Sequence, residues 1–214
     1  MPSVDEDLLT TLIARLDLEA KVRLLTGADF WSTPAEPAIG LRRMVLSDGP
    51  SGVRGESFDE RSPSLSLPSS TALGATWDPE LARRYGSALG AEARRQHADV
   101  VLGPTINLHR TPFGGRHFEA LSEDPLLTGE LAAAYVEGLQ AHGVAATPKH
   151  YVANDAESER FTVDNAVDER ALHELYLAAF EPAVTRAGAW AVMSAYNGVN
   201  GATMSENPLL AEPL

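Results

Sequence analysis

Apolar residues of this chain occur in two patterns, short continuous runs and stripes with helical spacing. Continuous runs bounded by polar or Gly/Pro-rich segments are typical of buried strands. These runs cover Met44–Leu46, Val100–Leu102, Val144–Thr147 and Trp190–Ser194. A helical stripe lies between each run and the next, and this repeated strand–helix alternation predicts a parallel sheet with helices packed outside it.

The predicted helices between the strands follow aspartates, two of which precede a proline. Asp78-Pro79 and Asp124-Pro125 begin the first two helices, and Asp168 precedes the third. Aspartate caps helix N-termini, and proline is favoured at the first helical position. The stripes contain Leu81, Tyr85, Ala88 and Leu89, then Leu131, Ala134, Tyr135, Gly138 and Leu139, and finally Leu172, Leu175, Tyr176, Ala179 and Phe180.

Two further helices are predicted before the first strand. Ser3 and Glu6 form a capping-box pattern ahead of apolar residues that continue to Leu16. A second helix is predicted over 18–25, ending at Gly27. Polar, Pro-containing or Gly-containing segments at 28–43, 55–70 and 154–167 are predicted to be loops.

The number of strands matches part of a closed barrel. A (β/α)8 barrel of the TIM type needs eight strands and typically ~250 residues, whereas four runs are evident here. The residues after Tyr196 are predicted to form a loop and the start of a helix, with no further strand. We predict an α/β fold, the first half to two-thirds of such a barrel over 1–214, with helices and a loop at 1–43 and βα units at 44–214.

Composition and charge exclude several classes of partner. The net charge is −13, so nucleic acid and anionic membranes would be repelled and a neutral partner is expected. No apolar run is long enough to cross a bilayer, and the acidic start MPSVDEDLL lacks an export signal. The chain has no cysteine, which excludes disulfides and a thiol nucleophile. We predict residence in the cytoplasm.

Polar groups follow the predicted strands, where α/β proteins place their chemistry. Asp48 and Arg54 follow the first strand and could grip neighbouring hydroxyls, or serve as a turn cap and a surface ion pair. Arg116 and Glu119 lie in the long loop after the second strand, as ligand contacts or as a supporting pair.

Lys149 and His150 are predicted to lie at the frayed end of the third strand. The lysine could donate to a sugar hydroxyl, form a Schiff base or bind phosphate, or the pair could be a salt bridge and a satisfied histidine. Met193 and Tyr196 close the fourth strand and could form an apolar floor with a hydroxyl donor, although Met193 could equally be core.

These strand ends are expected to converge on one pocket. The residue types, without a phosphate-binding glycine loop, indicate a polyol held by charge-assisted hydrogen bonds. The histidines show no metal-binding spacing, so no metal or other cofactor is predicted.

Segments around these residues resemble glycoside hydrolase family 3, the β-glucosidase-type enzymes. The matching segments are LSDGPSGVR (46–54), LGPTINLHRTPFGGRHFEALSEDPLLTG (102–129), ATPKHYVANDAE (146–157), VDERALHELYLAAFEPAV (167–184) and VMSAYNGVNG (192–201). They occur in the family's order and span nearly the whole chain. His117 departs from the family pattern, in which many relatives have Asn.

The resemblance implies an N-terminal barrel domain that holds the terminal sugar of a β-D-glycoside, expected to be a glucosyl unit. The substrate-binding residues it implies are Asp48, Arg54, Arg116, Lys149, His150, Met193 and Tyr196, with Glu119 supporting Arg116. The family's following α/β sandwich domain is expected to be absent from residues 1–214.

The resemblance also implies a retaining mechanism, which needs a carboxylate nucleophile and a carboxyl acid/base. The family's nucleophile is an Asp in a Ser-Asp-Trp-like motif after the strand of Met193 and Tyr196, but residues 197–214 contain no Asp. The acid/base normally comes from the following domain, so both catalytic groups are expected beyond Leu214. We therefore expect this polypeptide to supply the sugar-binding groups of a glycosidase and to be inactive alone.

Two alternatives from other classes remain. A Schiff-base lyase of the aldolase type would use Lys149 as its nucleophile, and needs that lysine desolvated with a lowered pKa. A non-catalytic sugar-binding module would bind glucose as a stably folded monomer. The sequence does not specify the glycosyl group, the linkage or the oligomeric state.

Overall fold

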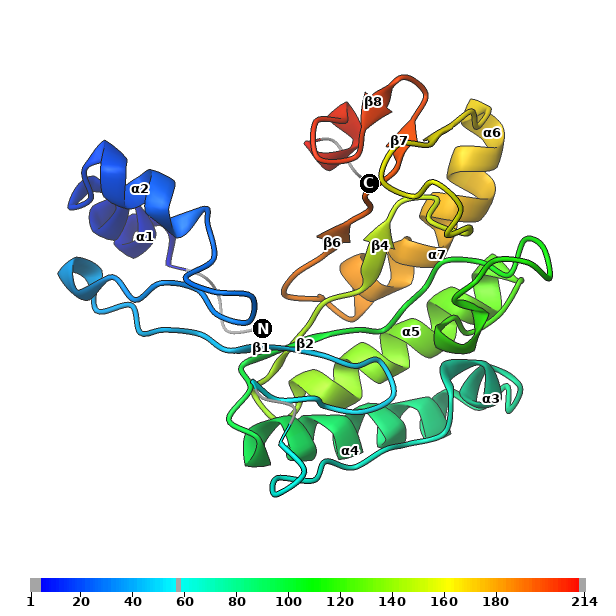
Figure 1. Cartoon of the computed structure of the whole chain (residues 1–214), viewed down its shortest axis with the longest axis horizontal. Helices are drawn as coiled ribbons and strands as arrows, with labels where there is room; N and C mark the ends of the chain where they lie inside the picture. The colour runs from blue at the N-terminus through cyan, green and yellow to red at the C-terminus, as the bar shows by residue number, and fades with distance from the viewer. Residues whose placement is uncertain (1–4, 57–58, 212–214) are drawn as a thin grey trace.

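The computed structural model describes residues 5–56 and 59–211. It consists of a body of strands and helices and an N-terminal arm, residues 5–43, which projects from one side of the body (Figure 1). Helices α4 and α5 lie side by side below the strands, and the helical segment that includes α6 and α7 lies beyond α5 (Figure 1).

Parallel strands form the centre of the body. β1 (Leu46–Asp48) pairs with β2 (Val100–Leu102), which pairs with β3 (Ala145–Ala146). β4 (Lys149–Tyr151) pairs with β6 (Met193–Ser194), again in parallel. A parallel bridge between Thr105 and Lys149 continues the pairing of the β2 and β3 segments toward β4. The strands therefore follow one another in chain order, as in an open section of a barrel.

The helices between these strands begin where the aspartates predicted them. Asp78 caps α4 (Pro79–Arg95) and Asp124 caps α5 (Pro125–Gln140), each carboxylate accepting two backbone N–H groups of the first turn. Asp168 caps a continuous helical segment formed by α6 (Glu169–Ala171), η3 (Leu172–Leu177), α7 (Ala178–Glu181) and η4 (Pro182–Arg186). Each carboxylate satisfies backbone donors that a helix start would otherwise leave unpaired.

Glycines allow α4 and α5 to pack closely. A Cβ added at Gly86 would lie 2.1 Å from the carbonyl oxygen of Tyr135, and one at Gly138 would lie 2.0 Å from that of Arg83. α5 is buried on most sides because it lies between α4 and the strands. Its buried surface is therefore wider than the single stripe that the sequence predicted.

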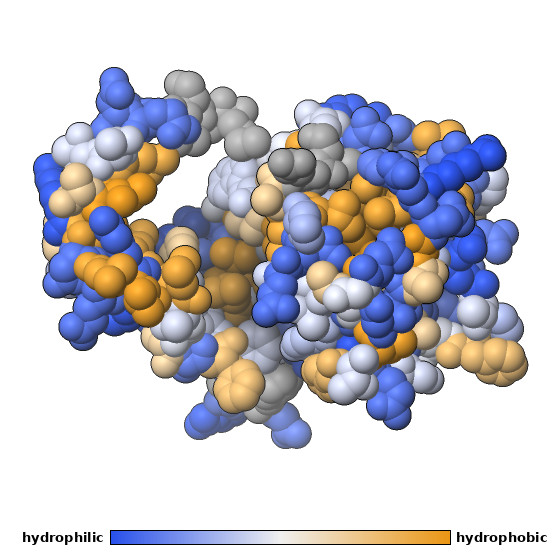
Figure 2. Space-filling model, turned by 90° about the horizontal axis from the view of Figure 1, so that it is seen from above, coloured by the Kyte–Doolittle hydropathy of each residue, from blue (hydrophilic) through white to orange (hydrophobic). Residues whose placement is uncertain are grey.

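The N-terminal arm contains α1 (Glu6–Ala14), α2 (Leu18–Leu24) and the short η1 (Pro37–Ile39). The residue that caps α1 is Asp5, whose side chain accepts from the backbone N–H of Leu8. Ser3, at which the sequence analysis predicted the capping box, lies outside the described residues. Apolar side chains of the arm are exposed and gather along it in Figure 2, including Leu8, Leu9, Ile13, Leu18, Val22 and Leu25. Exposed apolar groups of this extent are typical of surfaces that pack against other polypeptide.

Three strand predictions are corrected by the structure. β1 starts two residues later than the predicted run, because Val45 bridges instead to Ser32 of the arm. Lys149 and His150 begin the separate strand β4 and do not fray from the preceding run, since Pro148 cannot donate to the ladder. The prediction that no strand follows Tyr196 was wrong.

The strands after Tyr196 form a small side sheet. β5 (Asp164–Asn165), within the predicted 154–167 loop, pairs with β7 (Gly198–Val199), and β7 pairs antiparallel with β8 (Ala202–Thr203). The turn of the β7–β8 hairpin is Asn200-Gly201, both with positive φ. Asn-Gly suits such two-residue turns because both positions tolerate positive φ. The remaining short helices are α3 (Ser70–Gly74), η2 (His117–Glu119) and η5 (Pro208–Leu210).

Among the described residues, no helix combines the length and apolar character needed to cross a bilayer.

Candidate functional site

A cleft of about 670 Å³ opens beside the ends of β1 and β2 and along β4 and β6. Its walls come from the arm, from the loops after β2 and β4, and from the end of β6. The lining residues are Phe30, Trp31, Asp48, Leu102, Arg116, Lys149, His150, Arg160, Met193, Ser194 and Tyr196. The structure thus brings Asp48, Arg116, Lys149, His150, Met193 and Tyr196 to one cleft from widely separated parts of the sequence.

An ion pair between Asp48 and Lys149 lies in this cleft. Lys149 Nζ donates to Asp48 Oδ1 at 2.9 Å, and the lysine and aspartate side chains are 3% and 28% exposed respectively. Partial burial opposes ionisation, but the Lys149 ammonium and the Arg54 guanidinium hold the pKa of Asp48 below its usual value. Asp48 is therefore an anionic hydrogen-bond acceptor at neutral pH.

Arg54 lies outside the wall formed by the other predicted residues. Its Nη1 is 3.7 Å from Asp48 Oδ2, and its side chain lines an adjacent hollow bounded by residues 48–54, 64–67, Ser69, Phe118 and Glu119. Its backbone N–H donates to the Asp48 carbonyl oxygen at 3.1 Å. Arg54 therefore influences the cleft electrostatically, because its positive charge lies beside the Asp48 carboxylate.

Arg116 is held by a carboxylate next to it in the loop. Its Nη2 and Nε lie 2.8 Å and 3.4 Å from the two carboxylate oxygens of Glu119. Glu119 also accepts from Thr105 Oγ1 at 3.3 Å. Burial opposes the charge on Arg116, but the carboxylate of Glu119, with Glu157 and Asp48, raises the pKa of the guanidinium. Two contacts to one carboxylate fix the plane of the guanidinium, which directs its remaining donors.

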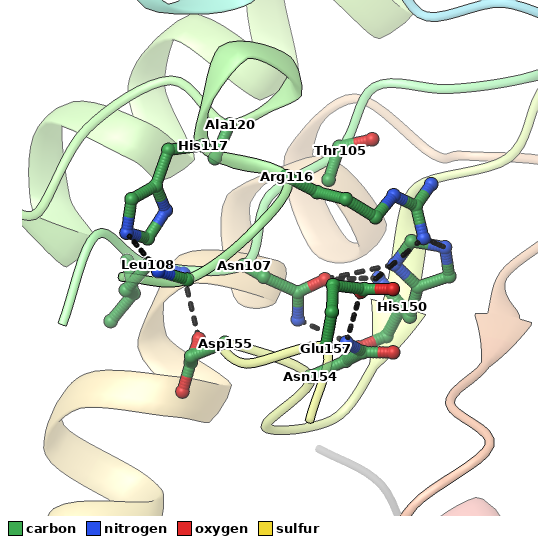
Figure 3. A pocket seen from close by; sticks show the side chains of 11 residues that line it. Thr105, Asn107, Leu108, Arg116, His117, Ala120, His150, Asn154, Asp155 and Glu157 are labelled. Carbon is green, nitrogen blue, oxygen red and sulfur yellow. Dashed lines mark hydrogen bonds and ion pairs between the residues drawn. The ribbon is translucent and has the colours of Figure 1, made fainter. Parts of the chain in front are cut away.

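His150 is oriented by Asn107. Asn107 Oδ1 accepts the His150 backbone N–H at 2.9 Å, and Asn107 Nδ2 donates to the His150 carbonyl oxygen at 2.9 Å. These two backbone contacts distinguish the oxygen of the Asn107 amide from its nitrogen. That oxygen lies 3.0 Å from His150 Nδ1, which must therefore carry the proton. Nε2 is then an acceptor, and it lies 3.4 Å from Arg116 Nη1 (Figure 3).

The imidazole of His150 is neutral at neutral and mildly acidic pH. Burial, followed by the charges of Lys149, Arg116 and Arg160, lowers the pKa of His150 to about 3. In the unfolded chain histidine titrates near ~6.5. The unfolded state therefore binds the extra proton between these values, so stability is present above pH ~6.5 and is lost as the pH falls toward 3.

We expect His150 to make the chain less stable in mild acid. Between pH 7.5 and 5.0 this residue should remove about 2 kcal/mol from the free energy of unfolding. His150→Gln should lose less than the wild type over this interval by about that amount, as measured by urea unfolding at the two pH values. The exposed His173→Gln is the matched control and should keep the wild-type difference. Equal pH differences for His150→Gln and the wild type would contradict the buried neutral state.

Several lining residues were missed by the sequence analysis. Phe30 and Trp31 lie in the segment predicted only as a loop, and Arg160 lies in the polar 154–167 loop. Arg160 lies over the rings of Phe161 and Tyr196, 4.9 Å and 5.4 Å from their centroids. Adjacent aromatic residues in a loop were the available signal for Trp31, whereas Arg160 follows no predicted strand.

The nucleophile and the acid/base are predicted to lie beyond Leu214, which is itself outside the described residues. The cleft therefore bears on the predicted binding residues, while the position of the catalytic groups stays a prediction.

The surroundings of Lys149 bear on the alternative in which it is a nucleophile. Lys149 Nζ donates to Asp48 and its side chain is 3% exposed, so the desolvation that a Schiff-base lysine needs is present and that alternative stays a prediction. Among the described residues, no group of three or more His, Asp and Glu side chains is arranged to hold a metal ion.

The family model and the known proteins that resemble this chain agree with one another. The family model described as the glycosyl hydrolase family 3 N-terminal domain matches residues 32–213. A β-glucosidase of Rhizobium radiobacter is 50% identical over 204 residues, which cover 95% of this chain and 25% of the relative. β-Glucosidase B of Emericella nidulans is 47% identical over 207 residues, 97% of this chain and 24% of the relative.

Solved structures agree with these sequence relatives. The β-glucosidase of Kluyveromyces marxianus, solved with glucose, superposes with a TM-score of 0.91 at 42% identity over 95% of this chain and 25% of its own. β-Glucosidase 3B of Thermotoga neapolitana, also solved with glucose, gives 0.91 at 40% identity over 97% of this chain and 32% of its own. The predicted fold class, an incomplete barrel of the TIM type, is confirmed. The chain spans about a quarter of the length of the curated relatives it matches.

Proposed function

The chain belongs to glycosyl hydrolase family 3, and we propose that its cleft binds the terminal, non-reducing glucosyl unit of a β-glucoside. The observation that carries this proposal is the Asp48–Lys149 ion pair, which shares one cleft with Arg116 and His150. The relatives named β-glucosidase, and the two solved with glucose, support the same class of ligand.

The cleft offers complementary hydrogen-bonding groups to a sugar ring. Asp48 accepts hydrogen bonds from hydroxyls, Lys149 and Arg116 donate hydrogen bonds to them, and the unprotonated His150 Nε2 is a further hydrogen-bond acceptor. Hydrogen bonds to charged partners are stronger than neutral ones, which lets a small polar ligand compete with water. Trp31 and Tyr196 add aromatic surface at the rim for the apolar faces of the ring.

We assign binding, and not bond cleavage, to these residues. Retention requires two carboxyl groups ~5–5.5 Å apart, one as nucleophile and one as acid/base. Asp48 is the carboxylate that lines the described cleft, and it is engaged by Lys149. We therefore propose that cleavage of the glycosidic bond in proteins of this family depends on groups outside these residues, and that this chain binds glucose without hydrolysing glucosides.

Titration with glucose tests the proposal. Trp31 lines the cleft, so we expect glucose to change the tryptophan fluorescence of the chain in a saturable way. Trp31→Phe should remove that change, which assigns the signal, because Trp77 and Trp190 do not line the cleft. Release of nitrophenol from p-nitrophenyl β-D-glucoside should stay at the rate of buffer alone.

Two results would refute this assignment. A chain that shows native circular dichroism and a cooperative melt, yet gives no saturable response to glucose by fluorescence or calorimetry, would remove the sugar site. Hydrolysis of the nitrophenyl glucoside above the buffer rate would remove the separation of binding from cleavage.

A further inference from the structure

Two arginines of the cleft share the carboxylate of Glu157. Glu157 Oε2 is 2.7 Å from Arg160 Nη1, and Glu157 Oε1 is 3.6 Å from Arg116 Nη1. Glu157 does not line the cleft; it borders a small polar cavity of about 10 Å³ together with Arg116 and His150 (Figure 3). The carboxylate therefore contacts both guanidinium groups from outside the cleft lining.

The negative charge of Glu157 offsets the repulsion between the positively charged Arg116 and Arg160. Arg116, Arg160 and Lys149 all line one cleft, and neighbouring cations repel in a partly buried site unless carboxylates lie between them. Asp48 balances Lys149, and Glu119 balances one edge of Arg116. Glu157 contacts the other edge of Arg116 and also Arg160, so its charge serves both guanidinium groups.

Glu157 is itself held in place by its surroundings. Asn154, which is buried, donates through Nδ2 to Glu157 Oε1 at 3.0 Å (Figure 3). The stem of Glu157 packs against Gly115, where an added Cβ would lie 3.0 Å from Glu157 Cγ. Gly115 has a φ of +87° and directly precedes Arg116, so the β2 loop and the β4 loop meet at this contact.

We propose that Glu157 is a positioning residue that fixes the directions of Arg116 and Arg160 toward a bound sugar. Arg160 is held on its other side by the Phe161 and Tyr196 rings, so the carboxylate and the rings together define one orientation. The inference rests on the proposed sugar-binding function, and it assigns to Glu157 an effect on affinity without contact with the ligand.

Glu157→Gln tests this role, because it keeps the shape of the side chain and removes its charge. We expect glucose to bind about tenfold more weakly, as when one hydrogen bond from a charged group is misdirected. The exposed Glu123→Gln is the matched control and should bind glucose as the wild type does. Urea unfolding of both variants shows whether any loss of affinity comes from loss of the fold.

A second measurement reports position without any sugar. The side-chain Nε–H signals of Arg116 and Arg160 in nitrogen-15 spectra of the free chain should shift or broaden in Glu157→Gln. The corresponding signal of Arg61, which pairs with Asp59 on the surface, should stay unchanged. A general loosening of the structure would move all three signals together.

The outcomes separate this inference from the proposal on which it rests. Failure of the wild type to bind glucose removes the sugar site itself, and the arginine signals then still decide whether Glu157 positions them. Wild-type binding with an unchanged affinity and unchanged arginine signals in Glu157→Gln overturns the positioning role alone.

Discussion

Replacing Lys149 with methionine is expected to weaken glucose binding by about 30-fold or more, equivalent to about 2 kcal/mol. The ammonium is almost fully buried and donates to Asp48 at 2.9 Å. Methionine fills much of the same space but leaves Asp48 without its main partner and removes a donor from the cleft. Truncating one member of such a pair costs ~2–5 kcal/mol, and the 28% exposure of Asp48 favours the lower end of that range.

The chain supplies its own control for this substitution. Lys21 is the other lysine of the sequence and is exposed on α2, so Lys21→Met should leave glucose affinity unchanged. Combining Lys149→Met with Asp48→Asn should cost less than the sum of the single changes, because each removes the same pair. Isothermal titration with glucose measures the wild type, the three single variants and the double variant. An affinity within threefold of the wild type for Lys149→Met would exclude Lys149 from the sugar site.

Valine at Gly138 is expected to destabilise the fold by about 3 kcal/mol or more. Its Cβ would lie 2.0 Å from the Arg83 carbonyl oxygen and 2.9 Å from the Ser87 nitrogen, both backbone atoms of α4. Backbone cannot rotate away as a side chain can, so α4 and α5 would have to separate. Urea unfolding followed by circular dichroism measures the loss.

Two further variants keep this prediction testable if the valine protein does not fold. Gly138→Ala carries the same clash at Cβ, although alanine favours a helix by about 1 kcal/mol over glycine. It should therefore still be less stable than the wild type. Arg84→Val on the exposed face of α4 should change stability by less than about 1 kcal/mol. A Gly138→Ala protein more stable than the wild type would show that the helices are not in close contact there.

The position of the cleft could be predicted from strand ends, but its complete lining could not. Asp48, Lys149 and Met193 stand at or beside strands whose apolar runs are visible in the sequence. Trp31 and Arg160 come from segments with no regular pattern, and Glu157 contacts Arg116 across 41 residues of chain. Hydrophobic periodicity reports which face of an element is buried and carries no record of which loops meet.

The sequence alone determined the alternation of strands and helices, because strand burial and aspartate caps are local properties read from neighbouring residues. It also determined the family, through motifs that lie in one order along the chain. Only the tertiary structure decided that Arg54 stands outside the cleft wall, that Lys149 begins a new strand beyond Pro148, and that His150 is protonated on Nδ1. Those features depend on atoms brought together from distant segments, where distance and burial set the chemistry of each group.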